Sequence, residues 1–224
     1  MDGINLQLHE KENLVILGKS GTGKSVLIKC IVSLLQHDEG SITVGKHELT
    51  AINEEDLIKV RRKIGFLFQG AALYDSMTVR ENLTFALSRL REKFSIEEIN
   101  NKIEEALENV SLPDSIDKMP SELSGGMKKR IGLARTLVVN PEIILYDEPT
   151  TGLDPITSDE ISDLINETRN KFNNSSIIIT HDIKCVKTVA DRIVMLKDGK
   201  VYKDGSLKEF ITDNDPFIQS FFKK

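Results

Sequence analysis

Cysteine is scarce in this chain of 224 residues, which contains only Cys30 and Cys185. Their separation matches no metal-binding spacing, so we expect two free thiols in a reducing cytosol. Long apolar runs are also lacking, because none approaches the ~20 residues that a membrane-spanning helix needs. The N-terminus has no signal-peptide pattern. If the protein serves a membrane, we therefore expect another chain to cross it.

Positive charge is not in excess, since 30 lysines and arginines face 35 acidic residues and the formal net charge is −5. This balance gives no indication of nucleic-acid binding and disfavours a purely electrostatic attachment to anionic lipid. The length allows one good core, or a core with a small inserted subdomain.

A glycine-rich segment lies between an apolar run, Leu14–Leu17, and a helical pattern that starts at Val26. Strand, glycine-rich turn and helix are the context that a phosphate-binding loop requires. The glycines let backbone N–H groups point at phosphate oxygens, and the helix adds the positive end of its dipole. Lys24 would supply a charge for the β- and γ-phosphates, and Ser25 a hydroxyl for Mg²⁺. We predict a nucleoside triphosphate site made by Gly18, Lys19, Ser20, Gly21, Thr22, Gly23, Lys24, Ser25 and Val26.

Strand and helix patterns at both ends of the chain indicate an α/β fold with a mostly helical insert near residues 72–138. A capping box of Ser95 and Glu98 opens one helix of the insert, and Asn140-Pro141 closes another over residues 125–138. The helix at 25–35 is apolar nearly all round, so we expect it to be buried. Strands are expected at 12–17, 41–44, 64–68, 142–146, 176–180, 192–196 and 200–202, and short amphipathic helices at 207–224.

Two acids, Asp147 and Glu148, end the apolar strand at 142–146. The carboxyl end of a strand buried on both faces delivers side chains to the ligand crevice of an open α/β sheet. Asp147 would then hold Mg²⁺, directly or through water, and Glu148 would polarise an attacking water. The alternative is an ordinary strand before an exposed acidic turn; the phosphate loop favours the catalytic interpretation.

Ser124, Gly125 and Gly126 open the helix at 125–138 with a second free N-terminus that allows close backbone access. Such an end can bind phosphate, and a plain capped helix is the alternative. Two phosphate-binding devices on different parts of one chain suggest that the second serves the nucleotide of another chain.

Two polar residues, Gln69 and His181, directly follow predicted strands. A lone histidine is more often structural. At the carboxyl end of a strand in a nucleotide-binding sheet, however, His181 can donate to a γ-phosphate oxygen as charge develops there. Residues 151–154 are typical of a tight loop beside such a site.

Six motifs in fixed order resemble the ATPase subunit of ABC transporters over essentially the whole chain. They are GKSGTGKS at 18–25, FQ at 68–69, LSGGM at 123–127, IILYDEP at 143–149, TGLD at 151–154 and TH at 180–181. The resemblance implies a homodimer in which each ATP lies between the phosphate loop of one subunit and the LSGGM helix of the other. It also implies one ABC ATPase domain over 1–224, with a P-loop NTPase (RecA-like) core at 1–71 and 139–205, a helical signature subdomain at 72–138 and a helical tail at 206–224.

Roles for individual residues follow from the same resemblance, with ATP and Mg²⁺ as cofactors. Glu148 is implied as the catalytic carboxylate and His181 as the γ-phosphate switch. Gln69 is implied to sense the γ-phosphate and Mg²⁺. The metal set is then Ser25, Gln69 and Asp147, and the set facing the partner subunit is Ser124, Gly125, Gly126 and Asp154.

A narrower resemblance is to the Mla-type, Mce-linked lipid transporter ATPases. It rests on residues 68–79, Glu81-Asn82, Met127 with the run 128–135, and the ending 215–218. It implies phospholipid or related lipid as cargo, moved between inner and outer membranes, and an Mce-type lipid-binding partner. It also implies an integral membrane permease held near residues 70–82, and a peripheral location on the cytoplasmic face of the inner membrane. An ABC transporter for another substrate is the alternative.

The N-terminal region departs from the family pattern. Family members have further residues that build two strands and supply an aromatic side chain that stacks on adenine. Here 17 residues precede Gly18, and none is aromatic. Either the sequence is a fragment or has a misassigned start, or the chain binds adenine less firmly. Because stacking on an aromatic is worth roughly 1–3 kcal/mol, we expect weakened ATP affinity and a frayed sheet edge.

Two other function classes fit less well. ABC ATPases that act on nucleic acid or ribosomes carry coiled-coil inserts or two cassettes, and this sequence has neither. The intact Lys24, Asp147, Glu148 and His181 argue against a non-hydrolysing module. The aromatic residues of 216–224 either pack on their own subunit or reach across the dimer.

Overall fold

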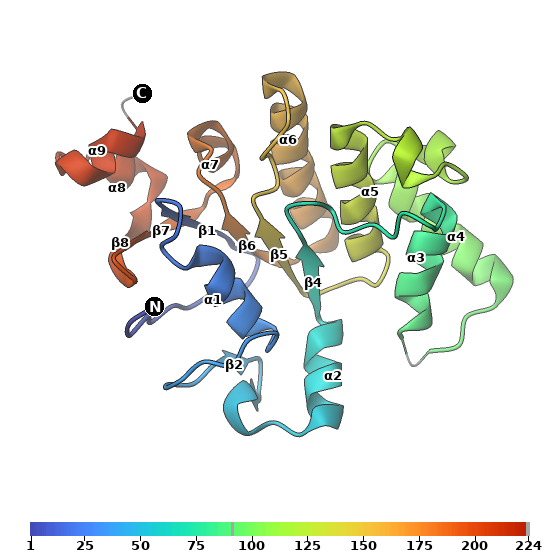
Figure 1. The fold of residues 1–224 in the computed structure, drawn as a ribbon, viewed down its shortest axis with the longest axis horizontal. Coiled ribbons are helices and arrows are strands. Elements are labelled where there is room, and N and C mark those ends of the chain that lie inside the picture. Colours follow the sequence, from blue (N-terminus) through green and yellow to red (C-terminus); the bar gives the residue numbers. More distant parts are fainter. Residues whose placement is uncertain (91, 223–224) are drawn as a thin grey trace.

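A computed structural model of the chain describes residues 1–90 and 92–222. Its main sheet has six strands in the order β4-β5-β6-β1-β7-β8, and β8 alone runs antiparallel to its neighbour. A parallel sheet of this kind needs long crossover connections, which the helices provide (Figure 1). The strands are β1 (Asn13–Gly18), β4 (Ile64–Leu67), β5 (Ile143–Asp147), β6 (Ser175–Ile179), β7 (Arg192–Lys197) and β8 (Lys200–Ser206).

Each face of the sheet has its own apolar core, because successive side chains of a strand point to opposite faces. Leu14 and Ile16 of β1 belong to the cluster that includes Ile28 of α1. Val15 and Leu17 belong to the larger cluster beneath the other helices. The helices outside the helical segment are α1 (Lys24–Ile31), α2 (Glu54–Arg62), α6 (Pro155–Phe172) and α7 (Ile183–Val189).

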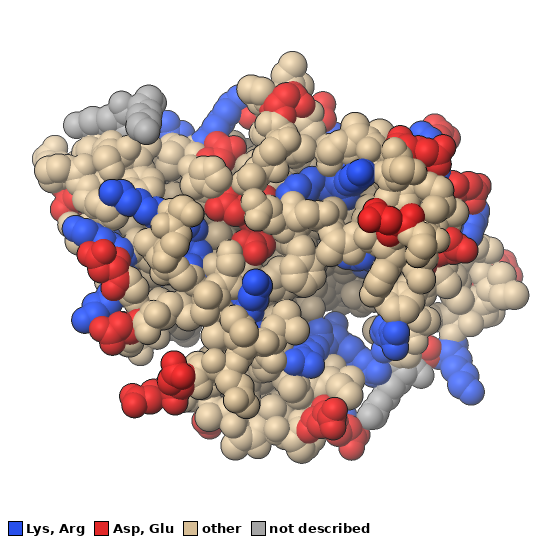
Figure 2. Space-filling view, in the orientation of Figure 1, with Lys and Arg blue, Asp and Glu red and all other residues tan. Residues whose placement is uncertain are grey.

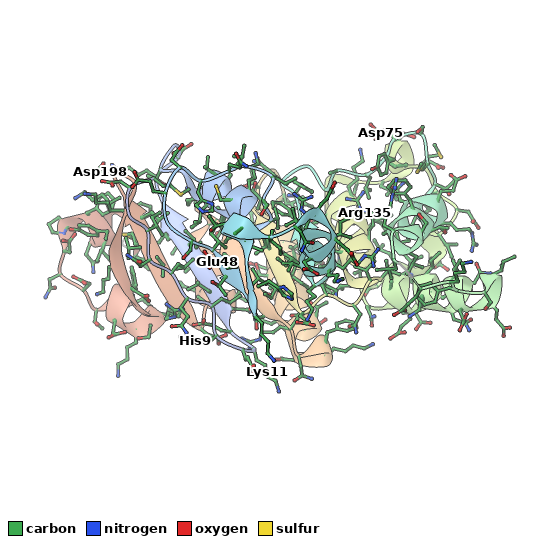
Figure 3. The ribbon with its side chains drawn as sticks, turned by 90° about the horizontal axis from the view of Figure 1, so that it is seen from below. His9, Lys11, Glu48, Asp75, Arg135 and Asp198 are labelled. Atoms are coloured by element: carbon green, nitrogen blue, oxygen red, sulfur yellow. The ribbon has the colours of Figure 1, made fainter. Side chains whose placement is uncertain are left out.

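A helical segment follows β4 and lies to one side of the sheet (Figure 1). It consists of α3 (Val79–Ser88), α4 (Ile96–Glu108) and α5 (Gly125–Leu137). The predicted capping box is confirmed, since the Ser95 and Glu98 side chains each accept from the other's backbone. A second box, Thr78 with Glu81, begins α3. In the side view, Arg135 of α5 and Asp75 lie on the side of the helical segment, and Asp198 lies toward the other end of the molecule (Figure 3).

The expectation of a buried helix over residues 25–35 is wrong in length and in burial. Helix α1 ends at Ile31, because Ser33 adopts a left-handed conformation with φ 54° and turns the chain away. The side chains of Val26, Leu34 and Leu35 are exposed. The apolar pattern therefore marked one buried face and a short exposed turn rather than a fully enclosed helix.

The remaining elements are short. A separate ribbon is made by β2 (Thr43–Val44) and β3 (His47–Glu48), and 3₁₀ turns occur at Leu49–Ala51, Pro113–Ser115 and Pro120–Glu122. The tail forms α8 (Leu207–Ile211) and α9 (Pro216–Phe222), which pack on their own subunit through Phe210 and Ile218. The last two residues of the predicted tail lie outside the described residues. Among the described helices, none is long and apolar enough to cross a membrane.

Candidate nucleotide site

The predicted phosphate loop connects β1 to α1 at the carboxyl edge of the sheet. Gly18 begins the loop in close contact with β7, where a Cβ would lie 2.8 Å from the Leu196 carbonyl oxygen. Gly21 and Gly23 have φ of 82° and 93°, in the left-handed region that favours glycine. In the described part of the chain, Thr22 alone among residues 20–25 donates its amide to another backbone carbonyl, Lys19 at 3.3 Å. The other amides of the loop are available to an anionic ligand.

Lys24 lies at the start of α1, and its side chain is folded back over the loop. Its Nζ donates to the carbonyl oxygens of Gly18 at 2.8 Å and Lys19 at 3.0 Å. Burial lowers the pKa of Lys24, and the nearby carboxylates of Glu148 and Asp147 oppose that shift. No carboxylate of the described residues forms an ion pair with this ammonium. It can therefore exchange two carbonyl oxygens for phosphate oxygens.

Ser25 and Asp147 come together although 122 positions separate them in the chain. The Ser25 hydroxyl, in the first turn of α1, donates at 2.9 Å to Oδ1 of Asp147, the last residue of β5. Alcohol and carboxylate oxygens are the ligands that Mg²⁺ takes in nucleotide sites. The residues present therefore fit a magnesium ion bound beside the phosphate loop.

Glu148 follows β5 in a left-handed conformation with φ 51°. Its Oε2 accepts from His181 Nδ1 at 2.8 Å and from the Thr151 hydroxyl at 3.1 Å. An ionised carboxylate only accepts, so the hydrogen-bonded His181 tautomer carries its proton on Nδ1. The Glu148 side chain is 13% exposed and that of His181 is 65% exposed. The two predicted residues thus meet at the edge where the phosphate loop lies, with the histidine on the solvent side.

Gln69 is not brought into this cluster. It follows β4, its side chain is exposed, and it has no hydrogen-bond partner within residues 1–90 and 92–222. The predicted metal set is therefore assembled in part, as Ser25 with Asp147.

The predicted second phosphate device lies at the N-terminus of α5, away from the phosphate loop (Figure 1). Ser124 is its N-cap, and its hydroxyl accepts from the Met127 amide at 3.3 Å. Ser124 and Gly125 are exposed. Gly126 is buried against α6, where a Cβ would lie 2.4 Å from Thr157 Cγ2. The end of α5 is thus open to an anion that does not come from this subunit's own loop.

Asp154 begins α6 and uses its carboxylate locally. Its Oδ1 accepts from the amides of Ile156 and Thr157, both at 3.1 Å, and its Oδ2 from the Thr157 hydroxyl. These bonds, the hydroxyl first, hold the pKa of Asp154 below its usual range. Next to it, Ile156 is 74% exposed. An exposed isoleucine beside a rigid cap is an arrangement that a second protein surface can cover.

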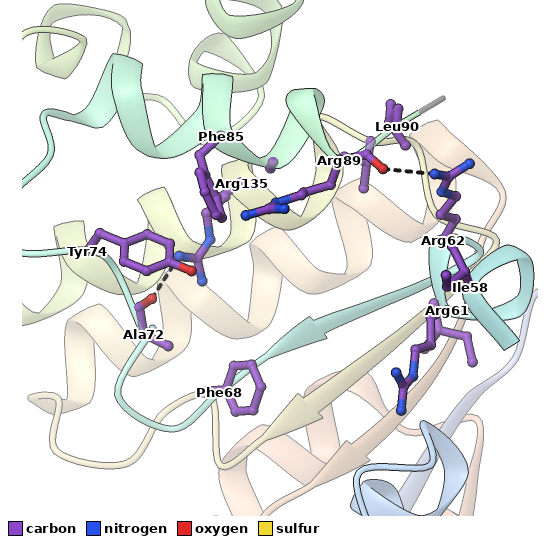
Figure 4. Close-up of a pocket in the computed structure, with 13 residues that line it drawn as sticks. Ile58, Arg61, Arg62, Phe68, Ala72, Tyr74, Phe85, Arg89, Leu90 and Arg135 are labelled. Atoms are coloured by element: carbon purple, nitrogen blue, oxygen red, sulfur yellow. Dashed lines mark hydrogen bonds between the residues drawn. The ribbon is translucent and has the colours of Figure 1, made fainter. Parts of the chain in front are cut away.

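A hollow of about 670 Å³ lies between α2, β4, α3 and α5, and the sequence analysis did not predict it. Four arginines of the described residues line it, from α2, α5 and the turn after α3: Arg61, Arg62, Arg89 and Arg135 (Figure 4). None of the four forms an ion pair with a described residue, and Arg62 Nε is buried without a hydrogen-bond partner. Figure 2 shows positive side chains gathered between α2 and the helical segment.

The guanidinium of Arg135 stabilises one wall of this arginine-lined groove. It donates to the carbonyl oxygens of Ala72 at 2.7 Å and Ala71 at 3.0 Å. Phe68, Tyr74 and Phe85 supply the aromatic part of the lining. The residues 70–82 predicted to hold a permease therefore form part of the groove.

The tail packs on its own subunit and also contacts the phosphate loop, whereas the sequence left open whether its aromatic residues pack there or reach across the dimer. The Phe217 ring of α9 lies 5.5 Å from Lys19 Nζ and 4.6 Å from Lys197 Nζ. Tyr202 of β8 packs edge-on against the same ring and donates its hydroxyl to Asp215. A cation over an aromatic face is attracted by the ring quadrupole. Lys19 is therefore shared between the loop and the tail.

Comparisons with known proteins agree with this geometry. The family model described as ABC transporter matches residues 1–151. The chain is 37% identical to Protein TRIGALACTOSYLDIACYLGLYCEROL 3, chloroplastic, of Arabidopsis thaliana, over 99% of this chain and 68% of that protein. It is 36% identical to Methionine import ATP-binding protein MetN of Carboxydothermus hydrogenoformans, over 99% of this chain and 65% of that protein. The chain thus spans about two thirds of the length of the curated relatives it matches.

Two solved structures share the fold at appreciable identity. One is a dimeric ATP-binding cassette in a post-hydrolysis state, bound to ADP and Pi, with TM-score 0.83 and 34% identity over 91% of this chain and 89% of that one. The other is cbiO1 from Clostridium perfringens, part of the ABC transporter complex cbiONQ, with TM-score 0.84 and 30% identity over 99% and 91%. The predicted α/β P-loop NTPase fold is confirmed. The chain belongs to the ABC transporter family and is an ATP-binding ATPase domain of that family.

Proposed function

We propose that this domain is the ATP-hydrolysing motor subunit of an ABC transporter that drives a separate permease. The observation that carries the proposal is the meeting of Lys24, Ser25, Asp147, Glu148 and His181 at one edge of the sheet. In this proposal, ATP binding closes a dimer of two copies of this domain, ATP hydrolysis opens the dimer, and the movement is transmitted to the permease.

In the proposed mechanism, the amides of the phosphate loop and Lys24 bind the phosphates. Ser25 and Asp147 would hold Mg²⁺, which neutralises phosphate charge when it is bound. Glu148 accepts a hydrogen bond from the attacking water and orients it toward the γ-phosphate. A His181 ring protonated on both nitrogens would donate Nδ1–H to Glu148 and Nε2–H to a γ-phosphate oxygen. Gln69 reaches this site by a movement of the segment that follows β4.

The composite site needs two copies of the chain. The exposed end of α5, at Ser124 and Gly125, supports the proposal that it binds the nucleotide held by the partner's loop. Asp154 and Ile156 would lie in the same interface. We accordingly propose a core at 1–71 and 139–205, a signature subdomain at 72–138 and a tail at 206–224.

We propose that the permease binds in the arginine-lined groove. Its lining combines aromatic residues with guanidinium groups that have no carboxylate partner, and it includes no acidic residue among those described. A short amphipathic segment with a carboxylate fits that chemistry better than a basic one does. Such docking would make the protein a peripheral component on the cytoplasmic face of the inner membrane.

Phospholipid or related lipid is the proposed cargo, with an Mce-type lipid-binding partner. The support is the resemblance at residues 68–82 and the Arabidopsis relative, which is named after a galactolipid. Methionine is the second candidate, because relatives of comparable identity are named methionine import proteins. Nothing in the net charge of −5 favours nucleic acid over either cargo.

Replacing Glu148 with Gln tests the motor function. We expect E148Q to bind ATP with the parent affinity, to lose turnover, and to accumulate as an ATP-bound dimer on size-exclusion chromatography. Hydrolysis by E148Q at the parent rate would refute the assignment of Glu148 as the catalytic carboxylate.

The partners are tested by affinity purification of the tagged protein from gently solubilised membranes, followed by mass spectrometry. A permease together with an Mce-type protein supports lipid transport. A permease with a methionine-binding protein supports the second candidate and overturns the first.

A further inference from the structure

Lys129 is a buried lysine with one hydrogen-bond partner among the described residues. It lies on α5, five positions after the N-cap Ser124, and is 5% exposed. Its Nζ donates to the backbone carbonyl oxygen of Glu148 at 3.1 Å. The residue proposed to orient the attacking water is thus bonded directly to the helix that carries the second phosphate device.

The charge of Lys129 has no ion pair within the described residues. Burying an ammonium without a paired carboxylate is unfavourable, so such a group is seldom retained for packing alone. Burial lowers the pKa of Lys129, while the carboxylates of Glu148 and Asp147 oppose the shift. The same burial and the same two acids act on the pKa of Lys24. Two buried lysines, one from the phosphate loop and one from α5, therefore act on one pair of carboxylates.

The backbone of Glu148 is held from both sides. Its amide donates to the Ile179 carbonyl oxygen of β6 at 2.8 Å, and its carbonyl accepts from Lys129 at 3.1 Å and from the Thr151 amide at 3.3 Å. Its φ of 51° is a conformation that a residue with a side chain adopts only under constraint. The sheet bonds the amide side of this residue, and on the carbonyl side Lys129 of α5 supplies the side-chain bond beside that of the local turn.

We expect the two lysines to respond differently when phosphate binds. Lys24 would exchange the carbonyl oxygens of Gly18 and Lys19 for phosphate oxygens. Lys129 would keep its bond, because its partner is the Glu148 backbone carbonyl.

We propose that Lys129 is a positioning residue that fixes Glu148 for water activation and transmits the position of α5 to the catalytic carboxylate. This inference rests on the proposed function. Since Ser124 and Lys129 are on one rigid helix, contact of Ser124 with the partner's nucleotide and placement of Glu148 become a single event. The permease groove lies on the same helix through Arg135. The 13-residue helix α5 thus joins the partner-facing Ser124, the Glu148 contact through Lys129 and the proposed permease groove.

The test compares K129M, K129Q and K129R with the parent chain. Met keeps the length but removes donor and charge, Gln keeps a donor without charge, and Arg keeps both. K102M is the matched control, because Lys102 is an exposed lysine of the neighbouring helix α4. Steady-state MgATPase gives kcat and KM, ATP binding is measured separately, and thermal unfolding verifies the fold of each variant.

We expect K129M to lower kcat by about tenfold to a hundredfold, the range of one charge-assisted hydrogen bond lost in the transition state, with KM for ATP within about twofold of the parent. K129Q is expected to lie between K129M and the parent, and K129R to recover most of kcat. K102M is expected to match the parent.

A folded K129M with parental kcat overturns the positioning role, and so does a loss of kcat that K129R and K129Q share equally with K129M. A rise in KM with unchanged kcat would also overturn it, because the residue would then act on ATP binding. E148Q separates this inference from the proposed function: if E148Q hydrolyses ATP at the parent rate, both fail, whereas an inactive E148Q with a normal K129M refutes Lys129 alone.

Discussion

Replacing Gly126 with Ala probes how closely α5 packs on α6. The added Cβ would lie 2.4 Å from Thr157 Cγ2, with Thr157 Cβ and Oγ1 next at 3.7 and 3.9 Å. One methyl group therefore accounts for the whole clash. Overpacking of this kind costs about 1–3 kcal/mol, against a gain of at most about 1 kcal/mol from the better helix propensity of Ala. We expect G126A to lower the free energy of unfolding by about 1–2 kcal/mol.

Thr157→Ser removes that methyl group and keeps the hydroxyl that bonds to Asp154. In the T157S background the clash is gone, so G126A should stabilise the domain by up to about 1 kcal/mol through helix propensity. The sign of the substitution thus reverses between the two backgrounds. Urea unfolding followed by far-ultraviolet circular dichroism measures all four chains, since the sequence has no Trp to report by fluorescence. The same sign in both backgrounds would refute the packing argument.

Three further predictions concern the core and the pH response. Asn82 is fully buried and bonds the backbone of Tyr74, Met77 and Thr78, so N82L should lower the free energy of unfolding by about 1–3 kcal/mol and speed proteolysis in the loop before α3; unchanged proteolysis would contradict this. Burial raises the pKa of Glu12, but bonds from Arg192 and the His9 amide outweigh burial and hold that pKa below its usual value. This carboxylate therefore stabilises the fold fully above the unfolded pKa, and the stabilisation is lost as pH falls through the folded pKa. E12Q should flatten the acid side of the plot of unfolding free energy against pH, and an unchanged plot would count against the Glu12–Arg192 pair. Burial raises the pKa of the Cys185 thiol to about 12, so iodoacetamide at pH 8 should label it far more slowly in the folded chain than in urea, and equal rates would show that the site is open.

Much of the sheet and of the catalytic edge could be predicted because it depends on local patterns. Continuous apolar runs mark the strands, and the residues directly after them, Asp147, Glu148 and His181, fall at one edge in any parallel sheet. Helix α2 and the long α6 were not predicted. Their polar faces dilute the apolar signal, although Asn53 and Asp154 are recognisable N-caps.

What the sequence did not predict depends on contacts between distant segments. The apolar pattern of residues 25–35 carries no sign that Ser33 turns left-handed. Nothing in the sequence around Lys129 indicates a bond to Glu148, and only the fold brings the two residues together. The arginine-lined groove draws its residues from α2, β4, α3 and α5, so no single stretch of sequence contains it. Gln69 is the opposite case, because the sequence motif predicts a site residue but the fold leaves its side chain exposed and apart from Ser25 and Asp147.

The contact between Phe217 and Lys19 makes the tail a thermodynamic partner of the phosphate loop. A side chain shared by two surfaces couples their equilibria, and such coupling is reciprocal. A ligand that draws Lys19 away from the Phe217 ring makes the docking of α9 less favourable. Docked α9 then makes the binding of that ligand less favourable by the same free energy. Lys197 and Tyr202 stay with the ring when Lys19 leaves, so the helix keeps part of its attachment. The order of α9 therefore carries information about occupancy at the loop, readable by amide hydrogen exchange.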